Sequence, residues 1–186
     1  SCAQEMADTP GYFRDPVGEN GAIIPRRGIM HKYHGRVLLI VSGGCAVHCR
    51  YCFRRHFPYN ENQNSRQQWR EALDYIRTDS SIGEVILSGG DPLVATDEQL
   101  QQLVEEIANI AHVRRLRIHS RLPVVIPERV TDTLLDAVTH ADLQTIMVIH
   151  CNHANEIDES VAAALTALRR RDITTLNQAV LLAGIN

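Results

Sequence analysis

The sequence predicts an α/β fold built on a parallel sheet, and two observations support this prediction. Five short runs are nearly continuous in apolar or β-branched residues, as expected of strands buried on both faces: residues 37–41, 84–87, 116–119, 145–149 and 174–182. From the second run onward, strand and helix patterns repeat about every 30 residues, the length of one β–α unit. Such alternation predicts parallel strands joined by right-handed crossovers.

The predicted helices are marked by the spacing of their apolar side chains and by their first residues. Three stretches place apolar residues at i, i+3, i+4 and i+7: residues 69–76, 100–107 and 161–168. A fourth stretch, residues 127–138, fits this spacing less cleanly. Thr96 with Gln99, and Ser65 with Gln68, match the capping box that begins a helix.

Length and composition indicate one soluble domain. A chain of 186 residues can form one hydrophobic core, and its net charge of −3 gives no general attraction to nucleic acid or anionic membranes. No apolar run approaches the roughly 20 residues that span a bilayer, and the first ten residues lack the pattern of a signal peptide. We therefore expect a cytoplasmic protein with reduced thiols.

Polar clusters follow four of the predicted strands at their carboxyl ends. They are residues 45–52, 88–91, 119–121 and 150–156. In parallel α/β proteins, ligands bind where the loops at these strand ends converge. The sequence therefore predicts an active site on this rim of the sheet.

Three thiols in the first cluster indicate a metal centre. Cys45, Cys49 and Cys52 lie within eight residues of a glycine-led loop, and thiolates at this spacing suit an iron–sulfur cluster or zinc. A zinc site would need a fourth ligand, for which His48 or His56 is available. Structural zinc sites usually pair two short ligand motifs, whereas three cysteines leave one metal position open. The spacing therefore favours a cluster that binds a substrate.

This Cys-x3-Cys-x2-Cys loop after the first strand resembles the signature of the radical S-adenosylmethionine superfamily. Residues 31–36 and 52–59 resemble the lysine 2,3-aminomutase family, and 52–59 is most similar to the bacterial branch that makes β-lysine for elongation factor P. Further matching motifs follow in the same order: residues 88–93, 118–124, 152–156 and 176–182. The resemblance spans nearly everything from Gly28 to Leu182 and is highly specific.

The resemblance implies a partial (β/α) barrel of the radical S-adenosylmethionine type, open on one side. Residues 36–186 would form the barrel, and residues 1–35 an N-terminal extension that contributes to the cofactor pocket. Cys45, Cys49 and Cys52 would hold three irons of a [4Fe–4S] cluster. The fourth iron would chelate S-adenosylmethionine, which is cleaved to methionine and a 5′-deoxyadenosyl radical.

Four residues after the second strand resemble the methionine-binding segment of the family: Ser88, Gly89, Gly90 and Asp91. Glycines in such a segment permit close backbone approach to a ligand and unusual φ angles. A tight turn between strand and helix would need the same residues. The cysteine loop upstream favours the binding interpretation.

The family also implies a second cofactor, pyridoxal phosphate, on which L-lysine is converted to β-lysine by migration of its amino group. Arg54 corresponds to the arginine that binds the substrate carboxylate, for which a guanidinium fork is well suited. Arg36 corresponds to an arginine near the cofactor phosphate, with Tyr33 beside the ring. Gln178 falls in the same pocket by analogy.

One departure from the family pattern indicates a truncated chain. Pyridoxal phosphate needs a Schiff-base lysine, and the only lysine, Lys32, corresponds to a different family position. We therefore expect a portion of a longer aminomutase, with no catalytic residue identifiable beyond the cluster ligands. The implied partners are L-lysine and an electron donor, with neither nucleic acid nor membrane, and a homo-oligomer remains open.

Two alternatives remain beside the aminomutase. One is another radical S-adenosylmethionine enzyme that needs no pyridoxal phosphate, and the other is a non-enzymatic zinc-binding module. Strand-end histidines could suggest a second metal site, but hydrogen-bonded structure is the favoured role of His119, His150 and His153. Cys151 is expected to be a small buried apolar residue.

Overall fold

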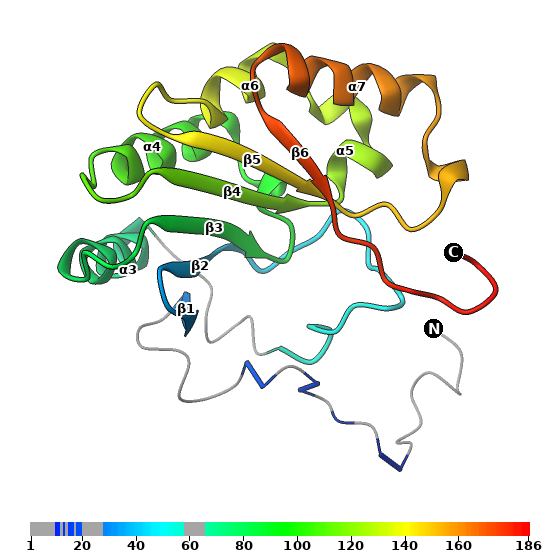
Figure 1. The fold of residues 1–186 in the computed structure, drawn as a ribbon, viewed down its shortest axis with the longest axis horizontal. Coiled ribbons are helices and arrows are strands. Elements are labelled where there is room, and N and C mark those ends of the chain that lie inside the picture. Colours follow the sequence, from blue (N-terminus) through cyan, green and yellow to red (C-terminus); the bar gives the residue numbers. More distant parts are fainter. Residues whose placement is uncertain (1–9, 12, 14, 17, 20–27, 58–65) are drawn as a thin grey trace.

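One open sheet of six strands forms the centre of the fold, seen in a computed structural model that describes residues 10, 11, 13, 15, 16, 18, 19, 28–57 and 66–186 (Figure 1). The strands lie in chain order: β1 (Ile29–Tyr33), β2 (Arg36–Ser42), β3 (Glu84–Gly89), β4 (Arg115–Ser120), β5 (Gln144–Ile149) and β6 (Thr174–Asn177). Strands β2 to β6 run parallel, and β1 pairs antiparallel with β2. The predicted partial barrel is confirmed.

Helices cover one face of this sheet (Figure 1). They are α3 (Arg66–Thr78), α4 (Asp97–Ala108), α5 (Leu122–Val125), α6 (Asp132–Val138) and α7 (Glu159–Arg170), with short 3₁₀ turns η1 (Pro92–Val94), η2 (Pro127–Arg129) and η3 (Ala154–Glu156). The hydrophobic core lies between these helices and alternate strand residues such as Leu39, Leu87 and Ile118. No helix in the described part of the chain is both long enough and apolar enough to cross a membrane.

Successive strand residues point to opposite faces, so the residues between the core positions face away from the helices. The register pairs Ile40 with Ser88 and His119 with Val148, and none of these four residues belongs to the core cluster under the helices. Arg36 lies on the same face, four residues before Ile40. The open face of the sheet therefore carries polar side chains that the helices do not cover.

Local sequence signals explain where several helices begin. Thr96 accepts a hydrogen bond from the Gln99 amide at 3.3 Å and donates its own amide to Oε1 of Gln99 at 3.1 Å, so the capping box is confirmed. Ser65 lies outside the described residues. The uneven stretch 127–138 is two elements, because η2 ends before Thr131 caps α6 by accepting from the Leu134 amide.

The strand predicted over residues 174–182 is shorter in the structure. Strand β6 ends at Asn177, and beyond it the Val180 amide donates to Oδ1 of Asn152 rather than to a strand. Leu181 is 90% exposed, so its apolar character does not reflect burial in the described part of the chain. Strand β1 was not predicted; it lies within the expected N-terminal extension, whose contribution to a cofactor pocket stays a prediction.

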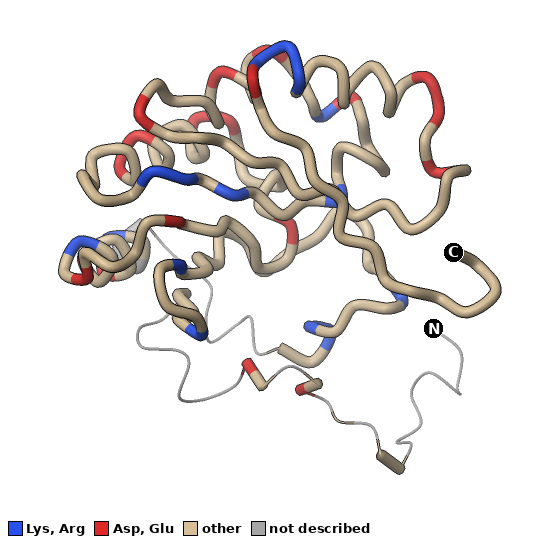
Figure 2. The backbone as a smooth tube through the Cα atoms, viewed as in Figure 1, with Lys and Arg blue, Asp and Glu red and all other residues tan. Residues whose placement is uncertain are grey.

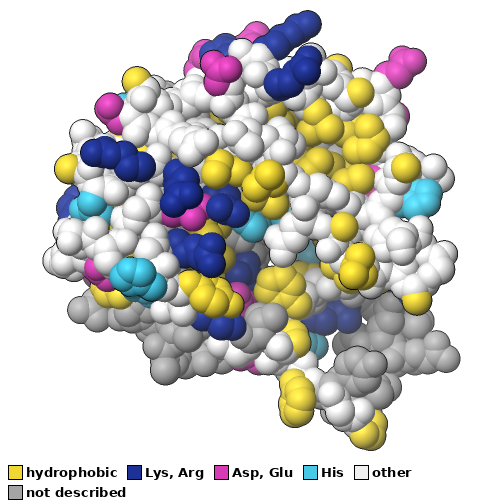
Figure 3. All heavy atoms as spheres, in the orientation of Figure 1, with side chains coloured by type: hydrophobic (Ala, Val, Ile, Leu, Met, Phe, Trp, Pro, Cys, Tyr) yellow, Lys and Arg dark blue, Asp and Glu magenta, His cyan; other side chains and the backbone are white. Residues whose placement is uncertain are grey.

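Charged residues are unevenly placed along the chain. Figure 2 shows acidic positions mostly on the helices, whereas basic positions recur along β4 and in the loop after β2. Figure 3 shows basic and histidine side chains gathered near the middle of one face, beside hydrophobic ones. The loop after β2 is the one that carries the three cysteines.

Candidate functional site

The cysteine loop leaves the carboxyl end of β2 and holds three free, partly exposed thiols. A tight turn orders part of it, since the Cys52 amide donates to the Cys49 carbonyl at 3.2 Å. Burial, followed by the negative charges of Asp91, Cys52 and Cys49, raises the pKa of the Cys45 thiol to about 11. The three predicted ligands are therefore close enough to repel one another electrostatically as thiolates.

Two glycines let the loop after β3 pack directly on the cysteine loop. A Cβ on Gly90 would lie 2.2 Å from the Gly44 carbonyl oxygen, and one on Gly89, whose φ is +119°, would lie 2.5 Å from the Ser42 carbonyl oxygen. The Gly90 amide donates to Ser42 at 2.7 Å and the Asp91 amide to Gly44 at 2.9 Å. The sequence suggested approach to a ligand; the structure shows approach to the chain's own backbone, and methionine binding stays a prediction.

Asp91 joins the carboxyl ends of β3 and β4. Its buried carboxylate accepts hydrogen bonds from the Leu93 amide at 3.0 Å, the Ser120 hydroxyl at 2.7 Å and the Arg121 amide at 2.8 Å. Burial raises the pKa of this carboxyl, while the bond from Ser120 opposes the rise. Asp91 therefore ties the backbone of the loop after β3 to the backbone at the end of β4.

Arg54, the predicted substrate-binding residue, lies beside the predicted cofactor residue Ser88. Its Nη1 donates to the Ser88 hydroxyl at 3.0 Å, and its Nε and Nη2 donate to the two carboxylate oxygens of Glu19 at 2.6 and 2.7 Å. Glu19 was not among the predicted site residues. It lies 35 residues from Arg54 in a segment without a motif, so no local pattern could have identified it.

Arg121 is a second residue that the sequence analysis gave no role. Its Nη1 donates to the Cys49 sulfur at 3.1 Å and to the Tyr51 hydroxyl, and its Nη2 donates to Glu156 at 2.9 Å. The guanidinium carbon lies 5.3 Å from the centre of the Tyr51 ring. Burial raises the pKa of Tyr51.

Two histidines lie next to each other at the ends of β4 and β5. The ring centres of His119 and His150 are 5.9 Å apart, and burial lowers the pKa of both, to about 4 for His119. The Nε2 atom of His119 is buried and has no hydrogen-bond partner among the described residues. Gln178, a predicted pocket residue, adjoins them, because its carbonyl lies 3.2 Å from Nδ1 of His150.

Tyr33 and Arg36 lie at the other end of β2. They are paired in the β1–β2 hairpin, where the Arg36 guanidinium lies 5.1 Å from the centre of the exposed Tyr33 ring. A strand of seven residues separates them from the cysteine loop by roughly 20 Å. The structure brings these two residues together but not to the cysteines, and their place in a cofactor pocket stays a prediction.

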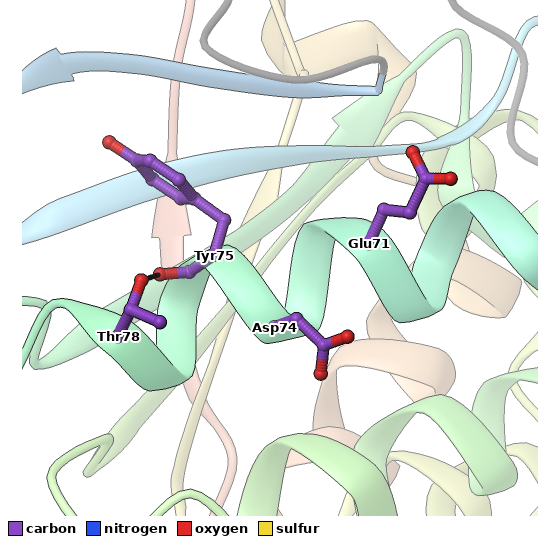
Figure 4. Close-up of a pocket in the computed structure, with 4 residues that line it drawn as sticks. All are labelled: Glu71, Asp74, Tyr75 and Thr78. Atoms are coloured by element: carbon purple, nitrogen blue, oxygen red, sulfur yellow. Dashed lines mark hydrogen bonds between the residues drawn. The ribbon is translucent and has the colours of Figure 1, made fainter.

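Two surface hollows in the described part of the chain contain none of the predicted site residues. One, on α3, is lined by Glu71, Asp74, Tyr75 and Thr78, with the Thr78 hydroxyl bonded to the Tyr75 carbonyl at 2.8 Å (Figure 4). Another lies near the start of β5, at the opposite end of the sheet from the cysteine loop. The strand-end rim, rather than either hollow, therefore remains the candidate site.

The donor set of the rim fits an iron–sulfur cluster. A Cys45 thiol with a pKa of about 11 is protonated at neutral pH, and bound iron would hold it as a thiolate. Within the described ranges, no three histidine, cysteine or acidic side chains converge on one point as ligands of a single ion. A [4Fe–4S] cluster differs, because each thiolate binds a separate iron.

Pyridoxal phosphate fits the described residues less well. The only lysine, Lys32, is exposed on β1, where its Nζ lies 5.7 Å from the centre of the Tyr33 ring. That position is at the opposite end of β2 from the cysteine loop. The described residues therefore offer this cofactor no lysine on the rim that holds the thiols.

Comparison with known proteins agrees with this chemistry. The sequence profile of the Radical SAM superfamily matches residues 39–186. The chain is 50% identical over 182 residues to the L-lysine 2,3-aminomutase of Escherichia coli, covering 98% of this chain and 53% of that protein. It is 51% identical over 183 residues to the L-lysine 2,3-aminomutase of Haemophilus influenzae, covering 98% of this chain and 54% of that protein. It is 35% identical over 185 residues to the L-lysine 2,3-aminomutase of Clostridium subterminale, covering 99% of this chain and 44% of that protein.

The chain thus spans about half the length of the curated relatives it matches. The matched profile covers most of the chain, including β3 to β6 and the cysteine loop. The chain belongs to the Radical SAM superfamily, and within it is similar to the L-lysine 2,3-aminomutases.

Proposed function

We propose that this chain is the cluster-binding part of a radical isomerase that converts L-lysine to β-lysine. One arrangement carries the proposal: three thiols, the Ser88–Asp91 segment and Arg54 share one rim of the partial barrel. The similarity to L-lysine 2,3-aminomutases supports the substrate. When bound, the cluster and S-adenosylmethionine supply a 5′-deoxyadenosyl radical, and pyridoxal phosphate supplies the carrier for the amino group.

The chain's own residues would position these groups. Cys45, Cys49 and Cys52 hold the cluster, and the packing of Gly90 on Gly44 keeps their loop against β3. Because the glycines bring the backbone of residues 88–91 to the cysteine loop, a ligand bound at the cluster would lie beside that segment. This placement supports the predicted contact with the methionine moiety.

Arginine supplies the positive charge beside Ser88. His119 has a pKa of about 4, so it is neutral at physiological pH, and the pKa of His150 is also lowered. Arg54 is always charged and presents a planar fork that matches a carboxylate. We assign it to the carboxylate of the amino acid substrate, because the other cation described on the rim, Arg121, is paired with Glu156.

The cellular setting follows from the same proposal. The resemblance of residues 52–59 to the branch that makes β-lysine for elongation factor P supports a role in modifying that factor, in the cytoplasm. The reaction requires an electron donor outside this chain. The lysine that would hold pyridoxal phosphate would also lie outside it.

The first test is to reconstitute the protein, as this chain and as its full-length parent, with iron and sulfide under anaerobic conditions. After reduction and addition of S-adenosylmethionine, 5′-deoxyadenosine is measured, and with the parent β-lysine as well. Cys45→Ala, Cys49→Ala and Cys52→Ala are each expected to abolish the nucleoside. The control is Cys151→Ala, because this buried thiol contacts the His153 carbonyl and lies outside the cysteine loop.

Two results would contradict the proposal in different ways. A folded parent protein that binds zinc and forms no nucleoside would identify a zinc-binding module. Formation of 5′-deoxyadenosine by the parent without β-lysine from L-lysine would instead identify a different radical enzyme on the same fold.

A further inference from the structure

Arg121 is held in place by the backbone at the end of β4. Its amide donates to Oδ2 of Asp91 at 2.8 Å, while the Ser120 hydroxyl donates to Oδ1 of the same carboxylate at 2.7 Å. The Leu122 amide in turn donates to the Ser120 hydroxyl at 3.0 Å. The main chain on both sides of Arg121 is therefore anchored to the loop after β3.

The Arg121 side chain extends from this anchor to the cysteine loop. Nη1 lies 3.1 Å from the Cys49 sulfur and also donates to the Tyr51 hydroxyl, and the guanidinium stacks over the Tyr51 ring at 5.3 Å. Nη2 donates to Glu156 at 2.9 Å, in an ion pair whose side chains are 20% and 24% exposed. One guanidinium thus joins a thiol and a ring of the cysteine loop to a carboxylate on η3.

Glu156 is itself fixed, which limits the freedom of its partner. Its Oε1 accepts the amides of Asn152 at 2.8 Å and His153 at 3.0 Å, which leaves Oε2 for Arg121. Partial shielding from water strengthens such charge-assisted contacts. The N–H directed at the Cys49 sulfur is therefore already oriented before any metal binds.

We infer that Arg121 is a positioning residue that donates a hydrogen bond to the Cys49 thiolate of the cluster and thereby raises the reduction potential of the cluster. The inference rests on the proposed function, in which Cys49 is a cluster ligand. Reduction transfers one electron from an external one-electron donor to the cluster, with no bond formed or broken. The added negative charge is stabilised by a nearby cation and by an N–H directed at a ligating sulfur.

A second arginine, Arg129, serves as a control that distinguishes an effect on the cluster potential from a purely structural role. Arg129 donates from Nε to the Leu93 carbonyl at 2.9 Å and from Nη2 to the Ala95 carbonyl at 3.0 Å, and it pairs with Asp97. It braces the loop next to Asp91 in much the same way. Unlike Arg121, its contacts are with residues 93–97 and not with the thiols.

The experiment is a redox titration of the cluster in the reconstituted full-length protein, followed by electron paramagnetic resonance. Arg121→Gln is expected to shift the potential to a more negative value, so that at a fixed donor potential the ratio of reduced to oxidised cluster falls about fivefold. Arg121→Lys, which keeps the charge but loses the fork, is expected to fall between this variant and the wild type. Arg129→Gln is expected to match the wild type.

Each remaining outcome is also decisive. A cluster potential in both Arg121 variants equal to that of the wild type would overturn the inference while leaving the proposed function standing. If Arg121→Gln holds no cluster, the test uses Arg121→Lys alone: a cluster potential more negative than that of the wild type supports the inference, and an equal potential overturns it. A wild-type protein that assembles no cluster would overturn the proposed function and this inference together.

Discussion

Glu19 binds Arg54 through two parallel hydrogen bonds, with Nε–Oε2 and Nη2–Oε1 distances of 2.6 and 2.7 Å and side chains only 14% and 10% exposed. A carboxylate of the chain thus occupies two donors of the fork that we assign to the substrate carboxylate. A further hydrogen bond of the guanidinium, from Nη1, goes to the Ser88 hydroxyl. A substrate carboxylate would have to share the fork with Glu19 or displace it.

We expect Glu19→Gln to lower the KM for the amino acid substrate in the full-length enzyme. A neutral amide competes less strongly for the guanidinium than a carboxylate does, because charged hydrogen bonds are about twice as strong as neutral ones. A difference of this kind corresponds to a decrease in KM of roughly fivefold, with kcat nearly unchanged. Steady-state kinetics with L-lysine measures both constants.

The matched control for that variant is Glu128→Gln, at an exposed glutamate on η2. It removes the same charge without touching Arg54 and should leave KM unchanged. An increase in KM for Glu19→Gln would mean that Glu19 orients Arg54 for binding rather than competing with the substrate.

Gly90→Ala is expected to separate the cysteine loop from β3. The new Cβ would lie 2.2 Å from a backbone oxygen of Gly44, so one of the two loops must move and the 2.7 Å bond from the Gly90 amide to Ser42 would be strained. Overpacking of this kind costs about 1–3 kcal/mol of the free energy of unfolding. Chemical denaturation measures that loss, and iron and sulfide analysis measures the loss of cluster binding.

Gly83→Ala provides the control for the effect of a methyl group. A Cβ there would meet its nearest neighbour, the His112 carbonyl oxygen, at 3.9 Å, an ordinary contact. Cluster content should then equal that of the wild type. Equal cluster binding in Gly90→Ala and Gly83→Ala would show that the close packing of Gly90 on Gly44 is not needed to hold the cluster.

The sequence predicted the central strands best, because runs such as residues 37–41 are apolar at every position. The run 37–41 became β2 with one residue added at each end. Strand β1 was not predicted, because only Ile29 and Met30 are buried and its other residues are polar or exposed. The run 174–182 was extended too far, because the apolar side chains after Asn177 have no neighbouring strand among the described residues.

In the candidate site, the sequence predicted residues that are close together in the chain but not contacts between residues that are far apart in it. Cys45, Cys49 and Cys52 share one loop, so their spacing alone predicts a common ligand. The bond from Arg121 to Cys49 joins residues 72 positions apart, and that from Arg54 to Glu19 joins residues 35 apart. Such contacts depend on how the strand ends and the N-terminal segment pack together in three dimensions. A short sequence motif does not predict this packing.

Cys45 should react slowly with alkylating reagents when no metal is bound. Its pKa of about 11, raised from 9.0 by burial and neighbouring negative charge, leaves about 100-fold less thiolate at pH 8 than an unperturbed thiol would have. Site-resolved mass spectrometry after iodoacetamide treatment measures the rate at several pH values. We expect the Cys45 rate to keep rising up to about pH 11; a plateau near pH 9 would contradict the environment that the structure shows.

The partly buried His119 predicts that acid weakens the fold. Its folded-state pKa of about 4 lies below the unfolded value of 6.5, so between these values the unfolded chain binds a proton that the folded chain does not. The free energy of unfolding is therefore unaffected by His119 above pH 6.5 and falls as the pH drops toward 4. From pH 7 to pH 5 the contribution of this group is about 2 kcal/mol. His150, whose pKa is also lowered by burial, acts in the same direction.

Urea unfolding of the wild type and of His119→Gln at pH 7 and pH 5 isolates this contribution, because all other titrating groups are common to both proteins. Glutamine keeps a polar side chain in the buried position but binds no proton in this range. The variant should lose about 2 kcal/mol less than the wild type on acidification. An equal loss in both proteins would mean that His119 takes up its proton in the folded state, and so that the open face of the barrel admits water as far as this ring.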